Sequence, residues 1–187
     1  MEARLEALQQ RGKAELKHEW APYSKISTHL KRALIAAEDS KFLDHEGFDW
    51  EGIESAIEKN IERGEVVAGG STISQQLAKN LFLSRSRTPW RKAQEAIITV
   101  MIEKLMSKRR ILEIYMNVIE WGDRVFGAEA AARHYFGVSA RNLSEAQAAR
   151  LAAMVPKPRF YERNRDTPWL AKKTRIIRAR MPLVAVP

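Results

Sequence analysis

Apolar residues recur every three or four positions along most of this 187-residue chain, and runs in which Val, Ile or Thr alternate with polar residues are missing from it. A spacing of three to four places side chains on one face of a helix, whereas strands need a period of two. The clearest stripe joins Ile26, Leu30, Leu34 and Ala37. The sequence therefore predicts an all-α or nearly all-α fold.

Capping signals divide the rest of the chain into helices. Thr88 and Pro89 are a good cap and first turn for a long helix to about position 106, and Gly64 ends a helix that begins near Trp50. Ser71 can cap another helix up to position 82. Further helices are expected at 108–119, 127–135, 148–155 and 168–181.

Two of these helices carry many apolar side chains. In the helix that begins near Trp50, that residue, Ile53, Ile57 and Ile61 are expected to face inward. The helix at 88–106 is apolar on most sides, which is typical of a helix surrounded by other elements. We therefore expect this second helix to be buried in the core.

The first 25 residues carry only a thin apolar stripe and are expected to form a peripheral helix or linker ahead of one domain at 26–187. The apolar stretch Ala96 to Ile102, broken only by Thr99, is far shorter than the roughly 20 residues that cross a bilayer. No hydrophobic signal-peptide core follows Met1. The chain as given is expected neither to span a membrane nor to carry its own export signal.

The formal net charge of +9 and the pI of about 9.9 indicate an anionic partner: nucleic acid, an acidic membrane surface or a phosphorylated substrate. Two segments, Lys79 to Arg110 and Lys157 to Arg180, each hold nine basic and two acidic residues. The absence of Cys excludes disulfides, thiolate zinc sites and a catalytic thiol, and the four His lack zinc spacing. No nucleic-acid-binding module is recognisable, so charge alone supports that partner.

Two acidic residues fall on the inward faces of their predicted helices. Glu38 continues the stripe through Leu30 at the C-terminal end of its helix, where the helix dipole and partial burial both disfavour a negative charge and suit a general base. Glu95 lies in line with Ile98 and Ile102 near its helix N-terminus, where it is expected to stay ionised. Such a pair suits glycosyl chemistry, although an ion pair with a neighbouring cation explains Glu38 equally well from position alone.

Two glycines precede the helix that Ser71 caps, and glycine before a helix N-terminus lets an anion approach closely. On the helical wheel, Thr72, Gln75, Gln76 and Lys79 share one face. The spacing of a nucleotide P-loop is absent. In isolation, such a face is more often a solvated surface than a binding site.

Five sequence motifs between about Lys31 and Tyr161 match one known family in order. The first two are Glu38-Asp39-Ser40-Lys41-Phe42 with His45, Gly47 and Asp49, and Gly70-Ser71-Thr72-Ile73-Ser74-Gln75-Gln76 with Lys79-Asn80. The others are Arg91-Lys92-Ala93-Gln94-Glu95, Lys108 with Ile111-Leu112-Glu113-Ile114-Tyr115-Met116-Asn117, and Leu151-Ala152-Ala153-Met154-Val155-Pro156-Lys157-Pro158. On these residues the chain resembles the peptidoglycan glycosyltransferases of glycosyltransferase family 51, especially the monofunctional biosynthetic transglycosylases. Ser74 departs from the family's usual Thr but keeps the hydroxyl.

This resemblance implies a mainly helical, lysozyme-like fold with two lobes flanking a catalytic cleft, and polymerisation of lipid II into glycan strands for the bacterial cell wall. Glu38 would be the general base for the acceptor's 4-hydroxyl, which attacks the donor's anomeric carbon with inversion and release of undecaprenyl pyrophosphate. Glu95 would be the second carboxylate, assisting that departure by positioning basic groups or a divalent cation, Mg²⁺ or Mn²⁺. No organic cofactor is implied.

The other motif residues divide into binding and structural positions. Lys79 and Arg87 match positions that hold the pyrophosphate in the family. Other cleft positions are matched by Ser71, Thr72, Gln75, Gln76, Arg91 and Lys92. Mainly structural roles are expected for Asp39, Phe42, His45, Asn80, Glu113 and Asn117.

The family normally carries an N-terminal membrane anchor, whereas Met1 begins a polar segment, so the anchor is expected to be missing from this chain. The expected place of action is the outer, periplasmic face of the bacterial cytoplasmic membrane. Expected partners are lipid II, the growing glycan strand, an anionic membrane surface met by the second basic segment, and other cell wall synthesis proteins, but no nucleic acid. A monofunctional enzyme, without a transpeptidase domain, is expected.

Two other interpretations stay open. A muramidase or lytic transglycosylase can also use a lone Glu on a similar fold, but it has no reason to carry the motif from Thr72 to Asn80. A noncatalytic module for anionic lipid or nucleic acid would explain the charge alone. Loss of turnover in Glu38→Gln with folding retained is expected only if the chain is an enzyme.

Overall fold

The computed structural model describes residues 16–64, 69–84 and 88–187, and most of these residues are helical. The α-helices are α2 (Thr28–Glu38), α3 (Trp50–Arg63), α4 (Ile73–Phe82), α5 (Pro89–Leu105), α6 (Lys108–Val118), α7 (Ala128–Phe136), α8 (Glu145–Met154), α9 (Pro158–Arg163) and α10 (Pro168–Arg180). Short 3-10 helices lie at Tyr23–Lys25, Ala140–Asn142 and Met181–Leu183. The strands are β1 (Lys17–His18), β2 (Glu120–Gly122) and β3 (Val125–Phe126). The predicted mainly helical fold is confirmed.

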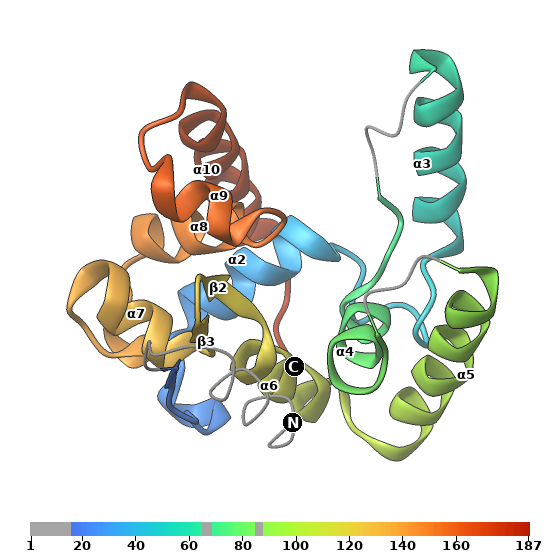
Figure 1. Ribbon diagram of the computed structural model, residues 1–187, viewed down its shortest axis with the longest axis horizontal. Coiled ribbons are helices and arrows are strands. Elements are labelled where there is room, and N and C mark those ends of the chain that lie inside the picture. Colours follow the sequence, from blue (N-terminus) through green and yellow to red (C-terminus); the bar gives the residue numbers. More distant parts are fainter. Residues whose placement is uncertain (1–15, 65–68, 85–87) are drawn as a thin grey trace.

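The helices form two lobes, with α6 at the base between them (Figure 1). In the larger lobe α8 packs against α2 and α10, and α9 packs against β2. In the smaller lobe α4 packs against α5 and reaches across to α6, while α3 extends away from the rest. The C-terminal end of α2 therefore lies where the two lobes meet.

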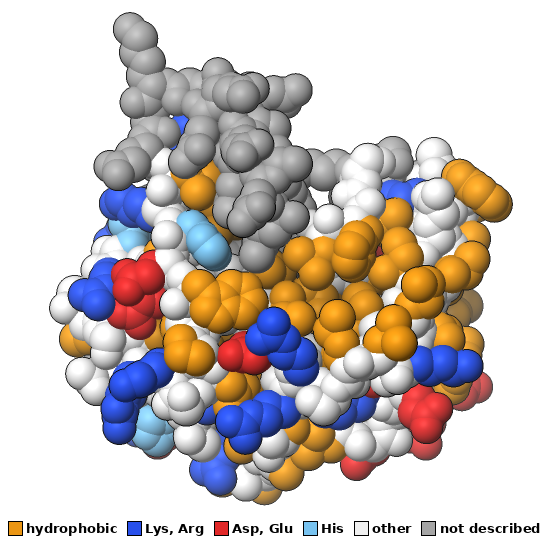
Figure 2. Space-filling view, turned by 90° about the horizontal axis from the view of Figure 1, so that it is seen from below, with side chains coloured by type: hydrophobic (Ala, Val, Ile, Leu, Met, Phe, Trp, Pro, Cys, Tyr) orange, Lys and Arg blue, Asp and Glu red, His pale blue; other side chains and the backbone are white. Residues whose placement is uncertain are grey.

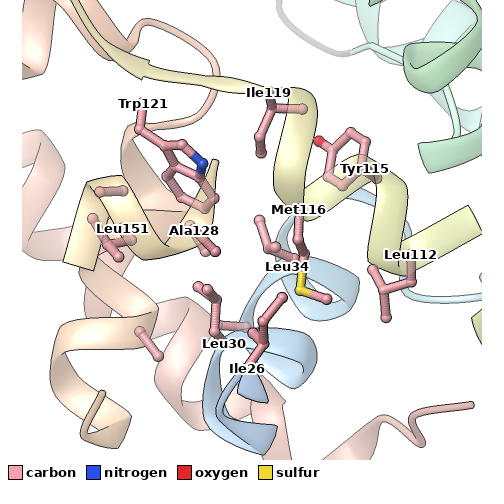
Figure 3. Close-up of a cluster of buried hydrophobic side chains, with 14 of the residues drawn as sticks. Ile26, Leu30, Leu34, Leu112, Tyr115, Met116, Ile119, Trp121, Ala128 and Leu151 are labelled. Carbon is pink, nitrogen blue, oxygen red and sulfur yellow. The ribbon is translucent and has the colours of Figure 1, made fainter. Parts of the chain in front are cut away.

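The larger lobe is built around a core to which α2, α6, α7 and α8 contribute (Figure 3). Ile26, Leu30 and Leu34 of the predicted stripe are each 2% exposed or less, and they lie beside Met116 of α6. Full burial of one such side chain contributes about 1.5–3 kcal/mol. This packing fixes α2, and with it the position of the residues at its C-terminal end.

Local capping signals begin and end most helices where the sequence predicts. Thr88 caps α5, with Pro89 in the first turn, and Gly64 ends α3 in the left-handed conformation with φ of 65°. At α4 the cap is Thr72 and not the predicted Ser71. The Thr72 hydroxyl accepts a hydrogen bond from the Gln75 backbone while the Gln75 side chain accepts one from the Thr72 backbone, and this reciprocal pair selects the later start.

Part of the N-terminal segment, expected as a peripheral helix or linker, forms an edge of a small sheet. Lys17 and His18 pair in parallel with Val125 and Phe126, and β2 pairs antiparallel to β3 on the other side. Residues 1–15 of that segment lie outside the described residues. Strands of two or three residues are too short to show a period of two, which explains why the sequence pattern does not reveal them.

The apolar surfaces of α3 and α5 contradict the prediction. Trp50, Ile57 and Ile61 were expected to face inward but are 71%, 53% and 75% exposed, and only Ala56 of α3 is buried. Within residues 16–64, 69–84 and 88–187, no helix packs closely against α3, so its apolar side stays exposed.

In α5 the buried residues are Glu95, Thr99 and Ile102, so this helix is not the core helix that its composition suggests. The opposite side is exposed, and its stripe at helical spacing is named here the apolar face: Trp90, Ile97, Met101 and Leu105. Figure 2 shows hydrophobic side chains gathered on this side of the molecule. The prediction of a core helix is wrong because α4 and α6 pack against only one side of α5, and the other side stays exposed among the described residues. No helix within the described ranges has the length and apolarity needed to cross a membrane.

Candidate active site

Glu38 is the last residue of α2 and lines a pocket of about 170 Å³ between the lobes. Asp49 and Gly52 at the start of α3, Ser71 before α4 and Arg180 of α10 also line this pocket. The Glu38 side chain is half-buried. The carboxylate is therefore held by the protein on one side and open to a ligand on the other.

The side chain of Gln76, on α4, holds the Glu38 carboxylate from the smaller lobe. Gln76 Nε2 donates a hydrogen bond to Glu38 Oε2 at 2.9 Å. The other end of the amide, Gln76 Oε1, accepts a hydrogen bond from the Tyr115 hydroxyl at 2.9 Å. The amide thus connects the α2 carboxylate to a phenol on α6.

Asp39 and His45 brace the loop that follows Glu38. His45 Nε2 donates to Asp39 Oδ1 at 2.9 Å, and the backbone N–H of Ile73 donates to Asp39 Oδ2 at 2.9 Å. The backbone N–H of Gly47 donates to His45 Nδ1 at 3.1 Å, so Nδ1 carries no proton and the imidazole is the Nε2–H tautomer. These contacts tie the loop to α4, and the structural roles expected for the Asp and the His stay a prediction.

Lys108, at the start of α6, supports the same loop from below. Its ammonium donates to the His45 carbonyl and, at 2.8 Å, to Glu103, and it lies 4.7 Å from the ring centre of Phe42. Phe42 is fully buried, and Glu103 also accepts a hydrogen bond from the Ser74 hydroxyl. The Phe therefore packs beneath the loop, as expected, and does not face the cleft.

The predicted cleft residues near the α4 N-terminus have different surroundings. Ser71 is exposed and lines the pocket. Thr72 and Gln75 are 2% and 4% exposed and form the capping box, and the Thr72 hydroxyl also donates to the Gly47 carbonyl at 2.7 Å. The described contacts of these two side chains are thus with the protein backbone and with each other.

Glu95 is 2% exposed and lies one helical turn from two cations of α5. Arg91 Nη1 lies 2.6 Å from Glu95 Oε2, and Lys92 Nζ lies 2.5 Å from Oε1. Burial raises the pKa of the Glu95 carboxyl, but the hydrogen bonds from Lys92 and Arg91 outweigh it and leave the pKa below its ordinary value. The carboxylate is therefore ionised at neutral pH, as its position in the helix predicts.

Lys79, on α4, lies within electrostatic range of both candidate carboxylates. Desolvation in the cleft lowers the pKa of the Lys79 ammonium, Glu95 and Glu38 oppose this effect, and Arg91 and Lys92 reinforce it. Two acidic residues that are far apart in the sequence thus act on one cation. Gly70 and Ser71 line the Glu38 pocket and also a second pocket lined by Lys92, so the Glu38 pocket adjoins the cation cluster around Glu95.

The described residues do not form a protein cage for a metal ion. No group of three or more His, Asp or Glu side chains with suitable geometry occurs in the ranges that the structure covers. The carboxylate of Glu95 is already occupied by two cationic side chains. A divalent cation bound here would need most of its ligands from substrate or water.

Comparison with known proteins matches the chain to the family model described as Transglycosylase over residues 4–182. The chain belongs to the transglycosylase family. It is 66% identical over 188 residues to the biosynthetic peptidoglycan transglycosylase of Nitrosospira multiformis, an alignment that covers this whole chain and 82% of the relative. It is 67% identical over 174 residues to the protein of the same name from Chromobacterium violaceum, covering 93% of this chain and 76% of that relative. The resemblance carried by the five motifs is confirmed.

Within this transglycosylase fold, the predicted site residues fall into three groups. Glu38 and Ser71 line the pocket, Gln76 donates to the Glu38 carboxylate, and Lys79 is exposed on α4 one turn after Gln76. Glu95 and its two partner cations lie beside Lys79 on the wall formed by α5. Arg87, expected at the pyrophosphate, lies outside the described residues, so its role stays a prediction.

Two predicted structural residues of α6 hold the segment that precedes α2. Glu113 accepts a hydrogen bond from the Tyr23 backbone N–H at 2.8 Å. Asn117 is fully buried, accepts from the Ala21 N–H at 2.8 Å and donates to the Ala21 carbonyl at 2.9 Å. Asn80 is half-buried on α4, and the structural roles expected for these three residues stay a prediction.

Two basic residues of α10, Lys173 and Arg180, have a relation to Glu38 that sequence reasoning missed. Burial lowers the pKa of the Lys173 ammonium and Glu38 opposes this shift, which places the two groups within electrostatic range of each other. Arg180 of the same helix lines the Glu38 pocket. Both belong to the basic segment expected at a membrane surface, and the packing of α10 against α2 brings Arg180 to the pocket.

Proposed function

We propose that this chain polymerises lipid II into glycan strands at the periplasmic face of the bacterial cytoplasmic membrane. It is an enzyme of the transglycosylase family, and its relatives are named for the biosynthesis of peptidoglycan. The observation that carries the proposal is that the Glu38 pocket shares Gly70 and Ser71 with a second pocket lined by Lys92, the cation that lies 2.5 Å from Glu95. One cleft thereby combines a candidate base with the positive charge that a pyrophosphate leaving group needs.

In this proposal Glu38 is the general base. Its carboxylate accepts the proton of the acceptor sugar's 4-hydroxyl while that oxygen forms a bond to the anomeric carbon of the donor. The bond from the anomeric carbon to the pyrophosphate oxygen breaks, and its electron pair leaves with undecaprenyl pyrophosphate. A single displacement of this kind inverts the anomeric centre. The hydrogen bond from Gln76 supports this role because it orients the carboxylate.

The smaller lobe stabilises the departing pyrophosphate. Lys79, Arg91 and Lys92 supply positive charge there, and Glu95 holds the last two by ion pairs of 2.6 and 2.5 Å. Arg91 Nε is buried and has no hydrogen-bond partner among the described residues, and a phosphate oxygen would satisfy it. Glu95 thus assists catalysis by positioning cations.

A divalent cation, Mg²⁺ or Mn²⁺, is proposed to enter with the substrate. Mg²⁺ commonly takes one or two protein carboxylates together with substrate phosphate oxygens and water. This fits a cleft whose own residues form no cage. Activity after removal of cations with a chelator, and after stepwise addition of Mg²⁺ or Mn²⁺, tests the dependence.

The apolar face of α5 supports action at a membrane. Its exposed side chains suit the boundary between headgroups and acyl chains, where apolar side chains are removed from water. Lipid II is held in that layer by its lipid tail. The apolar face would therefore bring the cleft close to the pyrophosphate of a membrane-bound substrate.

The experiment incubates the purified chain with labelled lipid II, detergent and Mg²⁺, beside Glu38→Gln and Glu58→Gln, and separates the products by size. Glu58 is a matched control because it is an exposed glutamate of α3. We expect polymer from the wild type and Glu58→Gln, and a rate at least about 100-fold lower from Glu38→Gln with its circular dichroism spectrum unchanged. Cleavage of preformed glycan without polymerisation would replace the proposal with a hydrolytic enzyme. Binding of anionic vesicles without either reaction would replace it with a binding module.

A further inference from the structure

The Tyr115 hydroxyl lies at the edge of the core, although the ring belongs to the buried cluster of Figure 3. The residue is 0% exposed, and its hydroxyl donates to Gln76 Oε1 at 2.9 Å. Burial, reinforced by the charges of Glu38 and Asp39, raises the pKa of Tyr115 well above its ordinary value. The phenol is therefore a permanent donor at any working pH.

This donor decides which way the Gln76 amide faces. With Oε1 toward Tyr115, Nε2 points at Glu38 and donates to its carboxylate at 2.9 Å and to the Ser71 carbonyl at 3.5 Å. In the flipped orientation, Oε1 would face the carboxylate, which places two acceptors together, and Nε2 would face the phenol. Only the observed orientation lets Tyr115 donate to Gln76 and Gln76 donate to Glu38.

We propose that Tyr115 is a positioning residue that acts through Gln76 to hold Glu38 as an ionised, oriented base. This inference rests on the proposed function, because it describes how the same carboxylate is kept ready for proton transfer. An N–H donor stabilises the charged form of a carboxylate and restricts its rotation. Gln76, assigned by its motif to the substrate, thereby belongs to the support of the base.

Other charged groups surround Glu38. Lys79 approaches from α4, Lys173 from α10, and Arg180 and Asp49 line the same pocket. Asp39 follows it in the chain, but its carboxylate is directed at His45 and the Ile73 backbone. All of these groups are unchanged when the Tyr115 hydroxyl is removed. A comparison of the wild type with Tyr115→Phe therefore isolates the effect of the relay, the name used here for the hydrogen bonds from Tyr115 to Gln76 and from Gln76 to Glu38.

The first test is Tyr115→Phe, which keeps the ring in the core and removes only the hydroxyl. We expect kcat for lipid II polymerisation to fall about 10- to 100-fold, because the base loses its fixed orientation, with KM within about twofold of the wild type. The acid limb of the pH–rate profile is expected to move to higher pH, since the amide can then turn its oxygen to Glu38. The control is Tyr135→Phe, whose hydroxyl donates to the Trp121 carbonyl away from the cleft, and it should match the wild type in both measurements.

The second test places Tyr115→Phe in a Gln76→Met background. If Tyr115 acts through Gln76, the double variant is no slower than Gln76→Met alone, within about twofold. An equal additional loss in both backgrounds would overturn the proposal in favour of packing alone. An unchanged kcat and pH profile in Tyr115→Phe would overturn it as well.

A third readout separates this inference from the proposed function. The Glu38 carboxyl carbon can be followed by ¹³C NMR across a pH titration without any substrate, and the signal is assigned by its loss in Glu38→Gln. We expect its midpoint to move to higher pH in Tyr115→Phe and not in Tyr135→Phe. If the wild type forms no polymer but the midpoint moves, the proposed function fails and the relay stands; an unmoved midpoint overturns the relay, whatever the activity.

Discussion

The carboxylate of Asp39 accepts a hydrogen bond at 2.9 Å from the backbone N–H of Ile73, the first residue of α4. Its other oxygen accepts His45 Nε2, also at 2.9 Å, and the Asp39 side chain is almost completely buried. The residue after Glu38 is therefore tied directly to the helix that carries Gln76. The base and its hydrogen-bond donor are held together by this buried carboxylate as well as by their own contact.

Replacing Asp39 with Asn should loosen this junction. The new amide keeps the size of the side chain, but one of its two positions becomes a donor that faces another donor, either the Ile73 N–H or His45 Nε2–H. We expect a free energy of unfolding about 2 kcal/mol lower than in the wild type, measured by urea denaturation. The exposed Asp44 of the same loop is the matched control, and Asp44→Asn should stay within about 0.5 kcal/mol of the wild type. Equal stability of the two variants would contradict this account of the junction.

Glu95 makes the free energy of unfolding depend on pH in the acid range. Because its pKa is lower in the folded than in the unfolded chain, its contribution to stability is present at pH values above the unfolded pKa of about 4.3. That contribution is lost as the pH falls through the lower, folded pKa. We expect Glu95→Gln to reduce the free energy of unfolding by about 2 kcal/mol at pH 7, and this difference from the wild type to shrink below about pH 4.

The measurement is denaturant unfolding of the wild type and Glu95→Gln at a series of pH values. Glu58→Gln serves as the control again, because that exposed residue should give a difference near zero throughout. If the loss of unfolding free energy in Glu95→Gln grew toward low pH, the pKa of Glu95 would be higher in the folded chain than in the unfolded chain, which contradicts the prediction.

Lys173 provides a test of the cleft wall formed by α10. Lys173→Met keeps most of the side-chain volume and removes the positive charge near Glu38. We expect kcat/KM for lipid II to fall about tenfold and the acid limb of the pH–rate profile to move to higher pH, because a nearby cation favours the ionised base. Lys172→Met removes an exposed charge one position earlier and should stay within about twofold of the wild type. Equal losses in both variants would assign the effect to the general charge of α10.

The apolar face predicts a separation of membrane binding from folding. Ile97 and Leu105 are 63% and 76% exposed, so their joint replacement by Glu should change the free energy of unfolding by less than about 1 kcal/mol. Binding to vesicles that contain anionic lipid should weaken at least about tenfold, because two apolar side chains no longer leave water. The control is Leu183→Glu, an exposed apolar residue near the C-terminus, which should bind like the wild type. Undiminished binding of the α5 variant in a sedimentation assay would exclude this face as the contact.

Much of the fold follows from short-range sequence signals. The stripe through Leu30 and Leu34 predicts α2 because one buried helix face needs only a repeated spacing. The capping pair Thr88 and Pro89 places the start of α5 because the cap geometry is local. Glu95 was correctly expected to be inward and ionised, since both of its cation partners lie within the preceding helical turn.

Features that depend on which elements meet could not be predicted in this way. The composition of α5 indicates a core helix, but its side with Ile97 and Leu105 is exposed and meets no partner helix among the described residues. The cap at Thr72 displaces that at Ser71 only through a reciprocal bond with Gln75. Lys173 and Tyr115 reach the surroundings of Glu38 because α10 and α6 pack beside it, and no spacing within either helix encodes that contact.

The Arg91, Lys92 and Glu95 cluster lies within a single turn of one helix, whereas the Glu38, Gln76 and Tyr115 relay draws on three helices. The α5 cluster and the relay therefore differ in how they tolerate substitutions during evolution. A change in the first can be compensated by a residue a few positions away, so its members are free to co-vary locally. A change in the second requires a matching substitution in a distant helix, and each of its members is constrained by the other two.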